Sequence, residues 1–350
     1  MRRSLLLPLL MLPLPLAAQI APTTPHVDFT HHDWTIACDN TRTCRAAGYQ
    51  DEASSDMPVS VLLTRRAGPD APVKAQMMLG SYEETVMPAT LRLRIDGADQ
   101  GVLDYNANEG TLALRAPQTA ALLASLRGRS DILLDSDDHR TWRLSGKGAT
   151  AVLLKMDEFQ GRLGTPGALV RKGGRAETSV LPPLPVPQLT LAAVPPTRPA
   201  DSALAASPAL RAALAATTSA DDCATLAPGG ALMEGEPPEA LHVTRLSADK
   251  LLVSVACWRG AYNEGSGYWV INDHAPYAPI LVTTLGNEAE GNAISGSHKG
   301  RGLGDCWSFN SWGWTGKAFV ATGVSTTGLC RLVAAGGAWT LPTYVTDERP

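Results

Sequence analysis

The sequence lacks the short signatures of the common catalytic classes. It has no H-E-x-x-H motif of zinc peptidases, no G-x-x-x-x-G-K-[ST] phosphate loop and no G-x-S-x-G nucleophile elbow. It also lacks C-x-x-C and any Cys and His cluster at zinc spacing. We therefore expect a binding protein rather than an enzyme, and we expect no metal and no cofactor.

The chain carries little charge and no excess of basic residues. Charged residues make up 18% of the sequence, and the formal net charge is −4. Removing Arg2 and Arg3 with an N-terminal leader would leave 28 basic against 34 acidic residues, a net charge of about −6. Nucleic acids and anionic membranes bind basic surfaces, so neither is expected as a partner.

The N-terminus has the three parts of a secretory signal peptide. A basic Met1 to Arg3 is followed by an apolar run, Ser4 to Leu16, and by the small residues Ala17 and Ala18. A membrane span needs about 20 apolar residues, whereas this run is shorter and contains three prolines. The pattern predicts a signal peptide over residues 1–18, export to the periplasm and no stable membrane span.

The six cysteines form an even set that is typical of disulfides in an exported protein. Spacing does not fix their connectivity. Near-neighbour pairing is favoured because short loops close most readily. The expected bonds are Cys38–Cys44, Cys223–Cys257 and Cys306–Cys330.

A proline-rich segment divides the chain. Eight prolines fall between Leu181 and Pro208, a stretch with almost no charge, and such composition favours an extended, semi-rigid linker. About 330 mature residues also exceed what one hydrophobic core usually serves. The expected organisation is an N-terminal domain at 26–180, a linker at 181–206 and a C-terminal disulfide-rich domain at 207–350.

Both domains are predicted to be mainly β and sandwich-like, each with one or two short helices. Short β-prone runs separated by Gly, Asp, Asn and Pro indicate strands at 58–65, 73–79, 90–95, 101–105, 110–115, 141–144 and 149–159, with a helix at 117–127. In the second domain, Ser207-Pro208 opens a helix. Strands are expected there at 241–246, 251–257, 268–272, 280–284, 318–322 and 330–333.

Three polar motifs are better explained as turns than as sites. Ser247-Ala-Asp-Lys250 fits the S-x-x-K pattern of penicillin-binding proteins, but it lies between two strand-like runs and lacks the companion motifs. His31 and His32 would point to opposite faces of a strand. Asp135 to His139 does not match a calcium loop.

The most unusual stretch is the glycine-rich Gly296 to Cys306, followed by three tryptophans. Glycine-rich backbone can cradle an anion, so Lys299 and Arg301 are candidate ligand-binding residues, and Asp305 could instead pair with a cation within a structural loop. Trp307, Trp312 and Trp314 could form an exposed stacking platform for sugar or peptide, or the core of a small sandwich. The burial of their side chains decides between these alternatives.

Four segments carry a resemblance to a known family. They are Asp33 to Ala46, Met156 to Arg162, Gly260 to Asn263 and Lys299 to Cys306. With them the chain resembles the domain of unknown function 1176 family of proteobacterial exported proteins, from about residue 26 to the C-terminus. This chain has Trp307 where members often carry a glycine. The N-terminal domain also loosely resembles invasion-associated locus B proteins.

The resemblance implies export and the domain layout and supplies no reaction. The favoured hypothesis is a non-enzymatic periplasmic protein that binds an envelope protein or a cell-wall ligand. One alternative is a cell-wall hydrolase without a recognisable motif, using Asp157, Glu158, Asp305 or Lys299, since paired carboxylates can supply acid and base. The other is a glycan-binding module that uses the C-terminal tryptophans.

Overall fold

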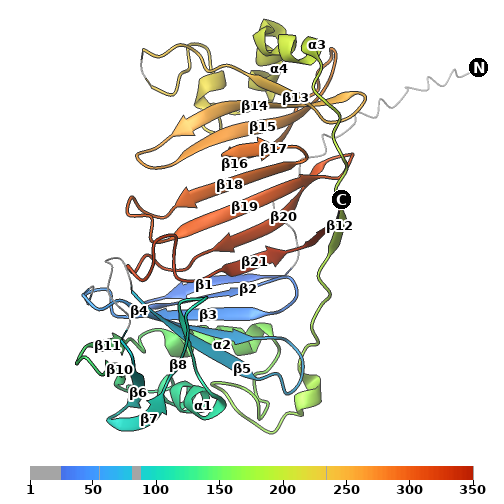
Figure 1. The fold of residues 1–350 in the computed structure, drawn as a ribbon. Coiled ribbons are helices and arrows are strands. Elements are labelled where there is room, and N and C mark those ends of the chain that lie inside the picture. Colours follow the sequence, from blue (N-terminus) through green and yellow to red (C-terminus); the bar gives the residue numbers. More distant parts are fainter. Residues whose placement is uncertain (1–24, 55, 81–87, 234, 350) are drawn as a thin grey trace, which may run out of the picture.

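The computed structural model describes residues 25–349 except 55, 81–87 and 234. The chain is mainly β, as the sequence predicts, with several antiparallel sheets and four short α-helices among the described residues (Figure 1). The expected signal peptide at 1–18 lies outside the described residues. Among the described helices, none is long and apolar enough to span a membrane.

A seven-stranded antiparallel sheet forms the centre of the N-terminal part, which comprises residues 25–180. Its strands lie in the order β1-β2-β3-β4-β5-β9-β8. Alternate residues of a strand face the same side, so Trp34, Ile36 and Cys38 of β2 face the core of the N-terminal part, while Ala37 faces the other side of the sheet. The bounds are Val27–His31 (β1), Trp34–Cys38 (β2), Cys44–Tyr49 (β3), Val59–Arg65 (β4), Val73–Leu79 (β5), Asp104–Asn106 (β8) and Thr111–Ala113 (β9).

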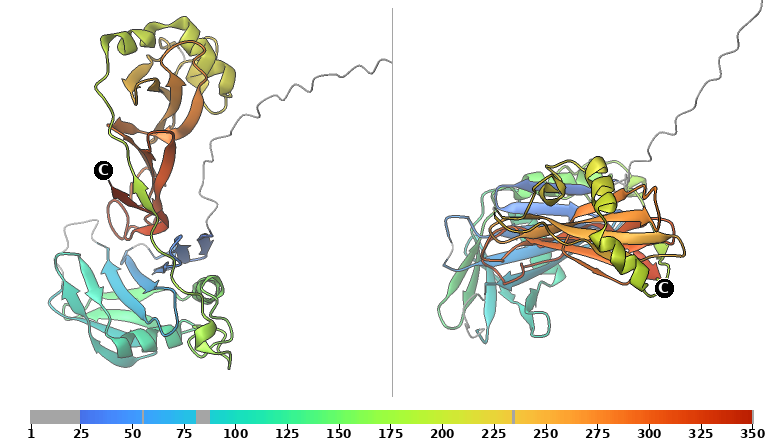
Figure 2. Two further views of the ribbon diagram at one scale, coloured as in Figure 1. Left: turned by 90° about the vertical axis from the view of Figure 1, so that its right-hand side faces the viewer. Right: turned by 90° about the horizontal axis from the view of Figure 1, so that it is seen from above.

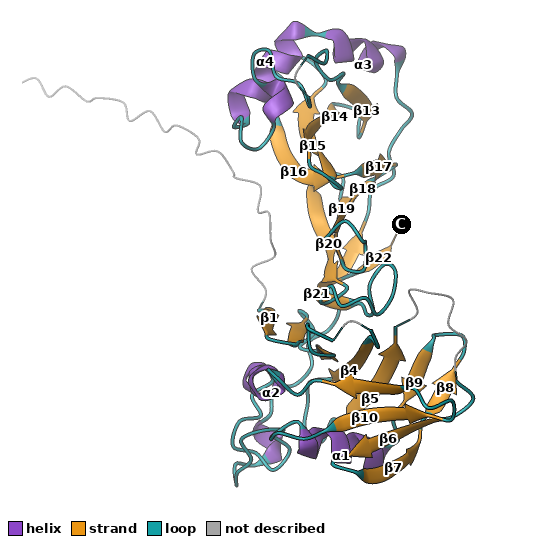
Figure 3. Cartoon of the chain, turned by 90° about the vertical axis from the view of Figure 1, so that its left-hand side faces the viewer, coloured by secondary structure: helices purple, strands orange, loops and turns teal. Residues whose placement is uncertain are grey.

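One core joins this sheet to a four-stranded sheet and two helices, and side chains from both sheets and both helices contribute to it. The second sheet has the order β11-β10-β6-β7, and Figure 3 shows α1 near β6 and β7 and α2 to one side of the sheets. The bounds are Leu91–Ile95 (β6), Ala98–Val102 (β7), Ala116–Ser125 (α1), Ile132–Ser136 (β10), Thr141–Leu144 (β11) and Ala149–Phe159 (α2).

The prediction of a strand at 149–159 is wrong, because this segment is helix α2. Its buried apolar residues are Ala149, Val152, Leu153 and Met156, which follow the helical spacing i, i+3, i+4 and i+7. The helix begins after Gly148, whose φ of 93° suits glycine at a chain reversal. Helical periodicity over eleven residues therefore outweighs the β-branched and aromatic residues in the run.

The proline-rich segment is extended from 181 to 198, as expected, and becomes helical at Pro199–Ala203 (α3); its extended part is hydrogen-bonded along both parts of the molecule. The amide of Leu184 donates to Thr41 O, and that of Ala192 donates to Trp314 O. Strand β12 (Gln188–Thr190) pairs in parallel with β22 (Asp347–Arg349). In Figure 2 the segment runs from the N-terminal part past the C-terminus to the helices at the far end. The predicted domain boundaries themselves stay a prediction.

Two adjoining sheets make up the C-terminal part, which comprises residues 207–349. A four-stranded sheet, β13-β14-β15-β16, lies under helix α4, whose first turn is capped by Ser207 Oγ at 3.2 Å from Leu210 N. A five-stranded sheet, β17-β18-β19-β20-β21, continues from it. The bounds are Pro199–Ala203 (α3), Pro208–Thr217 (α4), His242–Arg245 (β13), Lys250–Arg259 (β14), Glu264–Asn272 (β15), Ile280–Gly286 (β16), Glu288–Glu290 (β17), Ala293–Lys299 (β18), Trp307–Trp314 (β19), Phe319–Thr326 (β20) and Leu341–Val345 (β21).

The two parts contact each other directly through a separate apolar cluster. Ala37, Ala47, Tyr49 and Leu62 from the outer face of the seven-stranded sheet pack against Val333, Ala338, Trp339 and Leu341. The Trp339 indole donates to Ser60 Oγ at 2.7 Å, and Arg331 Nη2 donates to Asp33 Oδ1 at 3.0 Å. Figure 1 shows β21 beside β1 and β2. This cluster joins the two parts into one body.

The strand predicted at 330–333 is wrong, because this segment belongs to the irregular loop that docks on the seven-stranded sheet. Leu332 has a φ of 60°, and its amide donates to Asp305 Oδ2 at 2.8 Å instead of to a neighbouring strand. The six cysteines are joined as Cys38–Cys44, Cys223–Cys257 and Cys306–Cys330, the pairs that the sequence favours. We call the irregular loop, residues 327–340 between β20 and β21, the docking loop. The third disulfide joins the docking loop to the start of β19.

Candidate functional site

Four of the residues singled out from the sequence come together where β18 ends and β19 begins. The Lys299 ammonium lies 5.4 Å from the centroid of the Trp307 ring. Arg301 and Asp305 form a bidentate ion pair, with Arg301 Nε 2.7 Å from Asp305 Oδ1. The loop therefore holds its own acid and cation together, which matches the structural alternative weighed for Asp305.

Asp305 is almost fully buried, at 1% exposure, and it fixes the docking loop. Burial by itself would raise the pKa of this carboxyl, but the hydrogen bonds from Arg301 and from the Leu332 amide outweigh burial and lower the pKa. Asn263 fixes the backbone of Lys299, because its side chain accepts from Lys299 N at 2.8 Å and donates to Lys299 O at 2.9 Å.

A lowered carboxyl pKa predicts an acid-sensitive contribution to stability. Asp305 stabilises the fold fully above the unfolded value of about 3.9, and this contribution is lost as the pH falls through the lowered folded pKa. We expect Asp305→Asn to lower the free energy of unfolding by about 2–4 kcal/mol at pH 7. The gap between wild type and variant should shrink in urea titrations below about pH 4. A gap that stayed constant down to pH 2 would contradict the role of this carboxylate.

Trp312 and Trp314 lie on the opposite face of β19 and are buried, with exposures of 7% and 0%. They pack with Leu252, Tyr268 and Ile294 in the core that joins the two C-terminal sheets. The sequence left a stacking platform and a core as alternatives for these rings, and the structure places both in the core. Trp307 is separated from them by odd numbers of residues and so lies on the other face.

That other face of the five-stranded sheet is hollowed into a groove of about 540 Å³. Strand register aligns Ser295 with Ser311 and Gly323, and Ser297 with Phe309 and Ser325, so these residues share the groove floor. Thr340, Thr346 and Glu348 stand at its margin. The volume falls within the range of about 300–1,000 Å³ that is usual for ligand pockets.

Aromatic rings extend the floor of the groove. Phe309 is 40% exposed although it is large and apolar, and its ring is nearly parallel to that of Trp307, at 10° with the centroids 6.2 Å apart. Trp307 is among the site residues predicted from the sequence, whereas Phe309 and the serines of the floor are not. Along β19, Trp307 and Phe309 alternate with Ser308 and Asn310. This alternation with a period of two is a sequence signal that could have shown that Phe309 shares the face of Trp307.

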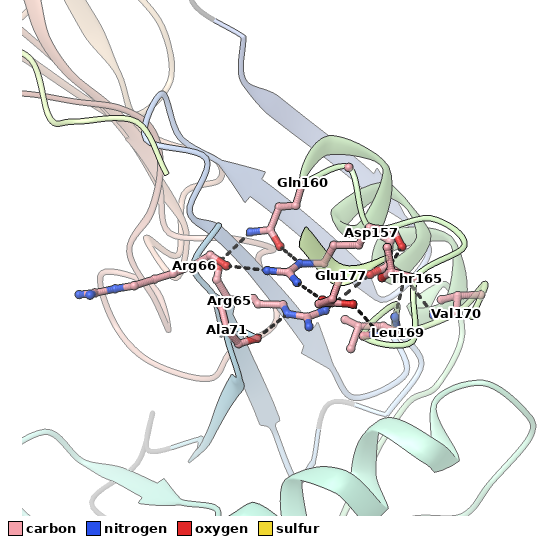
Figure 4. Close-up of polar contacts among 12 residues, drawn as sticks. Arg65, Arg66, Ala71, Asp157, Gln160, Thr165, Leu169, Val170 and Glu177 are labelled. Carbon is pink, nitrogen blue, oxygen red and sulfur yellow. Dashed lines mark hydrogen bonds and ion pairs between the residues drawn. The ribbon is translucent and has the colours of Figure 1, made fainter. Parts of the chain in front are cut away.

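The carboxylates considered for catalysis do not form an open pair. Asp157 is fully buried, and its Oδ2 accepts the amides of Leu169 and Val170 at 2.7 and 3.0 Å (Figure 4). Burial raises its pKa, although the two amides and Arg65 oppose this. Glu158 instead forms a surface pair with Lys155 at 2.8 Å. Asp157 therefore belongs to the buried polar network around Arg162, and Asp305 stabilises the docking loop in the other part.

The three polar motifs interpreted as turns are turns. Ser247 Oγ accepts from Lys250 N at 3.1 Å between β13 and β14. His31 and His32 lie at the β1–β2 turn, where His32 has a φ of 51°. The segment from Asp135 to His139 ends β10 and turns back, with Asp138 paired to Arg140.

One group of acidic and sulfur-containing residues within the described part of the chain is close enough to resemble a metal site. The ligand atoms of Asp305, Cys306 and Cys330 lie within 4.8 Å of one another. Both sulfurs are joined in a disulfide, and the carboxylate is paired with Arg301. A thiolate is what a metal would require here, so this donor set does not fit one.

Comparison with known proteins matches one family to most of the described chain. A family model described as "Protein of unknown function (DUF1176)" matches residues 28–346. The uncharacterized protein YpfG of Escherichia coli (strain K12) is 26% identical over 312 residues, covering 82% of this chain and 84% of the relative. No solved structure matches. The family model and this relative therefore match most of the length of the chain, and neither has an assigned activity.

Proposed function

The chain belongs to the DUF1176 family of proteins of unknown function, and on that premise we propose that it is an exported, non-enzymatic binding protein of the cell envelope. The observation that carries this proposal is the groove on the five-stranded sheet. It is a hollow of ligand size on paired strands, whose backbone is held rigid by the neighbouring strands.

Export is supported by the signal-like residues 1–18 and by three disulfides, which persist in oxidising compartments. The non-enzymatic character is supported by the way the candidate acids are used. Asp157 and Asp305 are buried and hydrogen-bonded, so neither is placed to exchange a proton with a substrate in the groove.

We expect the mature protein to sediment with purified cell envelopes and to lose this ability when the groove is filled. Ser325→Tyr places a ring over the centre of the floor and should reduce the bound fraction at least tenfold. Thr244→Tyr is the matched control, because Thr244 is exposed on strand β13 outside the groove and should sediment like wild type.

Two results would contradict the proposal. One is that Ser325→Tyr sediments as wild type does, while its circular dichroism spectrum shows that it is folded. The other is turnover of wall material by the purified protein. Mass spectrometry of periplasmic protein should find an N-terminus at Gln19 and no free thiol, and a cytoplasmic product still starting at Met1 would rule out export.

A further inference from the structure

Building on the proposed function, we propose that the groove binds a neutral polysaccharide chain, which stacks on Phe309 and Trp307 and is hydrogen-bonded by the serines of the floor. The chemistry of the lining points to this class. Ser295, Ser297, Ser311, Ser325 and the margin threonines supply hydroxyl groups, and the lining residues carry one charge, that of Glu348.

The hydroxyl groups on the floor are available to a ligand. Ser311 Oγ bonds with Thr322 Oγ1 at 2.8 Å, but the side chains of Ser295, Ser297 and Ser325 make no hydrogen bond to another described residue. A hydroxyl is both donor and acceptor, so it matches the hydroxyl and amide groups around the rim of a sugar ring. Such a lining binds polar ligands without requiring a charge on them.

The aromatic pair supplies the apolar part of sugar recognition. The faces of a pyranose ring carry C–H groups, which pack on an aromatic ring, while its hydroxyls point outward to polar partners. Phe309 lies between Ser297 and Ser325 in the strand register, so a ring stacked on it has serines on two sides. Trp307 extends the platform along β19 toward Lys299.

An extended peptide fits this floor poorly. Peptides that add to a sheet use the free N–H and C=O groups of an edge strand. The floor strands β19 and β20 are paired on both sides, so their backbone groups are already bonded. An anionic chain is also disfavoured over the groove floor, because the one charged lining residue, Glu348, carries a negative charge, whereas Lys299 lies outside the lining, beside Trp307.

The test compares defined oligomers by calorimetry on the mature, oxidised protein. We expect saturable binding of at least one neutral tetrasaccharide among chitotetraose, cellotetraose and maltotetraose, with weaker or no binding of an alginate tetramer or a neutral serine- and alanine-rich peptide. Phe309→Ala should weaken the sugar at least tenfold. Tyr105→Ala, an exposed aromatic of the N-terminal part, should leave it unchanged.

The outcomes separate this inference from the function on which it rests. Preference for the alginate or the peptide, an unchanged affinity in Phe309→Ala, or no binding of any neutral sugar would overturn it. If envelope sedimentation still depends on Ser325 in that case, the binding function stands with a different ligand. If Ser325→Tyr leaves sedimentation unchanged, both proposals fail.

Discussion

Replacement of Arg162 with alanine is expected to lower the free energy of unfolding by about 3–5 kcal/mol. The guanidinium group is fully buried, and it donates to Gln160 Oε1 at 2.9 Å, to Glu177 Oε1 at 3.1 Å and to Gly68 O at 2.6 Å. Removing it leaves Gln160 Oε1 and Gly68 O buried without their donor, and the partly buried Glu177 loses its cation. The network in Figure 4 connects strand β4, helix α2 and the loop that follows it.

Urea unfolding followed by tryptophan fluorescence measures this loss. Arg162→Lys keeps the charge but not the planar fork, so it should recover only part of the stability. Arg94→Ala is the matched control, because the Arg94–Asp135 pair is 2.9 Å apart on the surface and should matter by less than about 1 kcal/mol. An Arg162→Ala protein as stable as the Arg94→Ala protein would show that the buried network is dispensable.

The strands that the sequence predicted are those with a local signal. Runs such as Val73 to Leu79 and Thr141 to Leu144 carry β-prone residues bounded by turn formers, and they coincide with β5 and β11. The strand prediction for segment 149–159 is wrong because four buried apolar residues at helical spacing make it a helix. Segment 330–333 was assigned to a strand, although its backbone bonds are directed to Asp305.

The groove shows which part of a site can be deduced from a sequence and which cannot. The parity of residues along β19 separates Trp307 and Phe309 from Trp312 and Trp314, and this could be read from the sequence once β19 is recognised as a strand. The hollow itself depends on the neighbours of β19, because β20 and β21 supply Ser325 and Val345 from later in the chain. Strand order is a tertiary property that one sequence does not state.

The contact between the two parts was beyond local patterns for the same reason. It joins residues near 33–62 to residues near 329–345, whereas the proline-rich composition of the linker predicts only a semi-rigid connection between them. The resemblance segments nevertheless mark this contact. Asp33 pairs with Arg331, and Asp305, held by Arg301, binds the Leu332 amide. Asn263 fixes Lys299 at the end of β18, just before the loop that contains Arg301 and Asp305.

Replacement of Trp339 with alanine is the second large effect, and it should uncouple the two parts as well as destabilise them. Trp339 is buried at 6% exposure, in the apolar cluster that it shares with Ala47 and Leu62 of the N-terminal part and Leu341 of its own part. Truncating a buried tryptophan costs about 3–5 kcal/mol. The separate cores of the two parts contain none of the residues of this cluster, so each part can stay folded without it.

Differential scanning calorimetry of the oxidised protein distinguishes the two effects. Wild type should unfold in one transition because the cluster couples the parts, whereas Trp339→Ala should give two transitions, one for each part. Trp339→Phe keeps an aromatic ring but loses the hydrogen bond to Ser60 Oγ and part of the buried apolar area, so it should stay a single transition that is weakened less than in Trp339→Ala. Two transitions already present in wild type would mean that the cluster does not couple the parts. One unshifted transition in Trp339→Ala would mean that the coupling lies elsewhere, in the hydrogen bonds of the proline-rich segment.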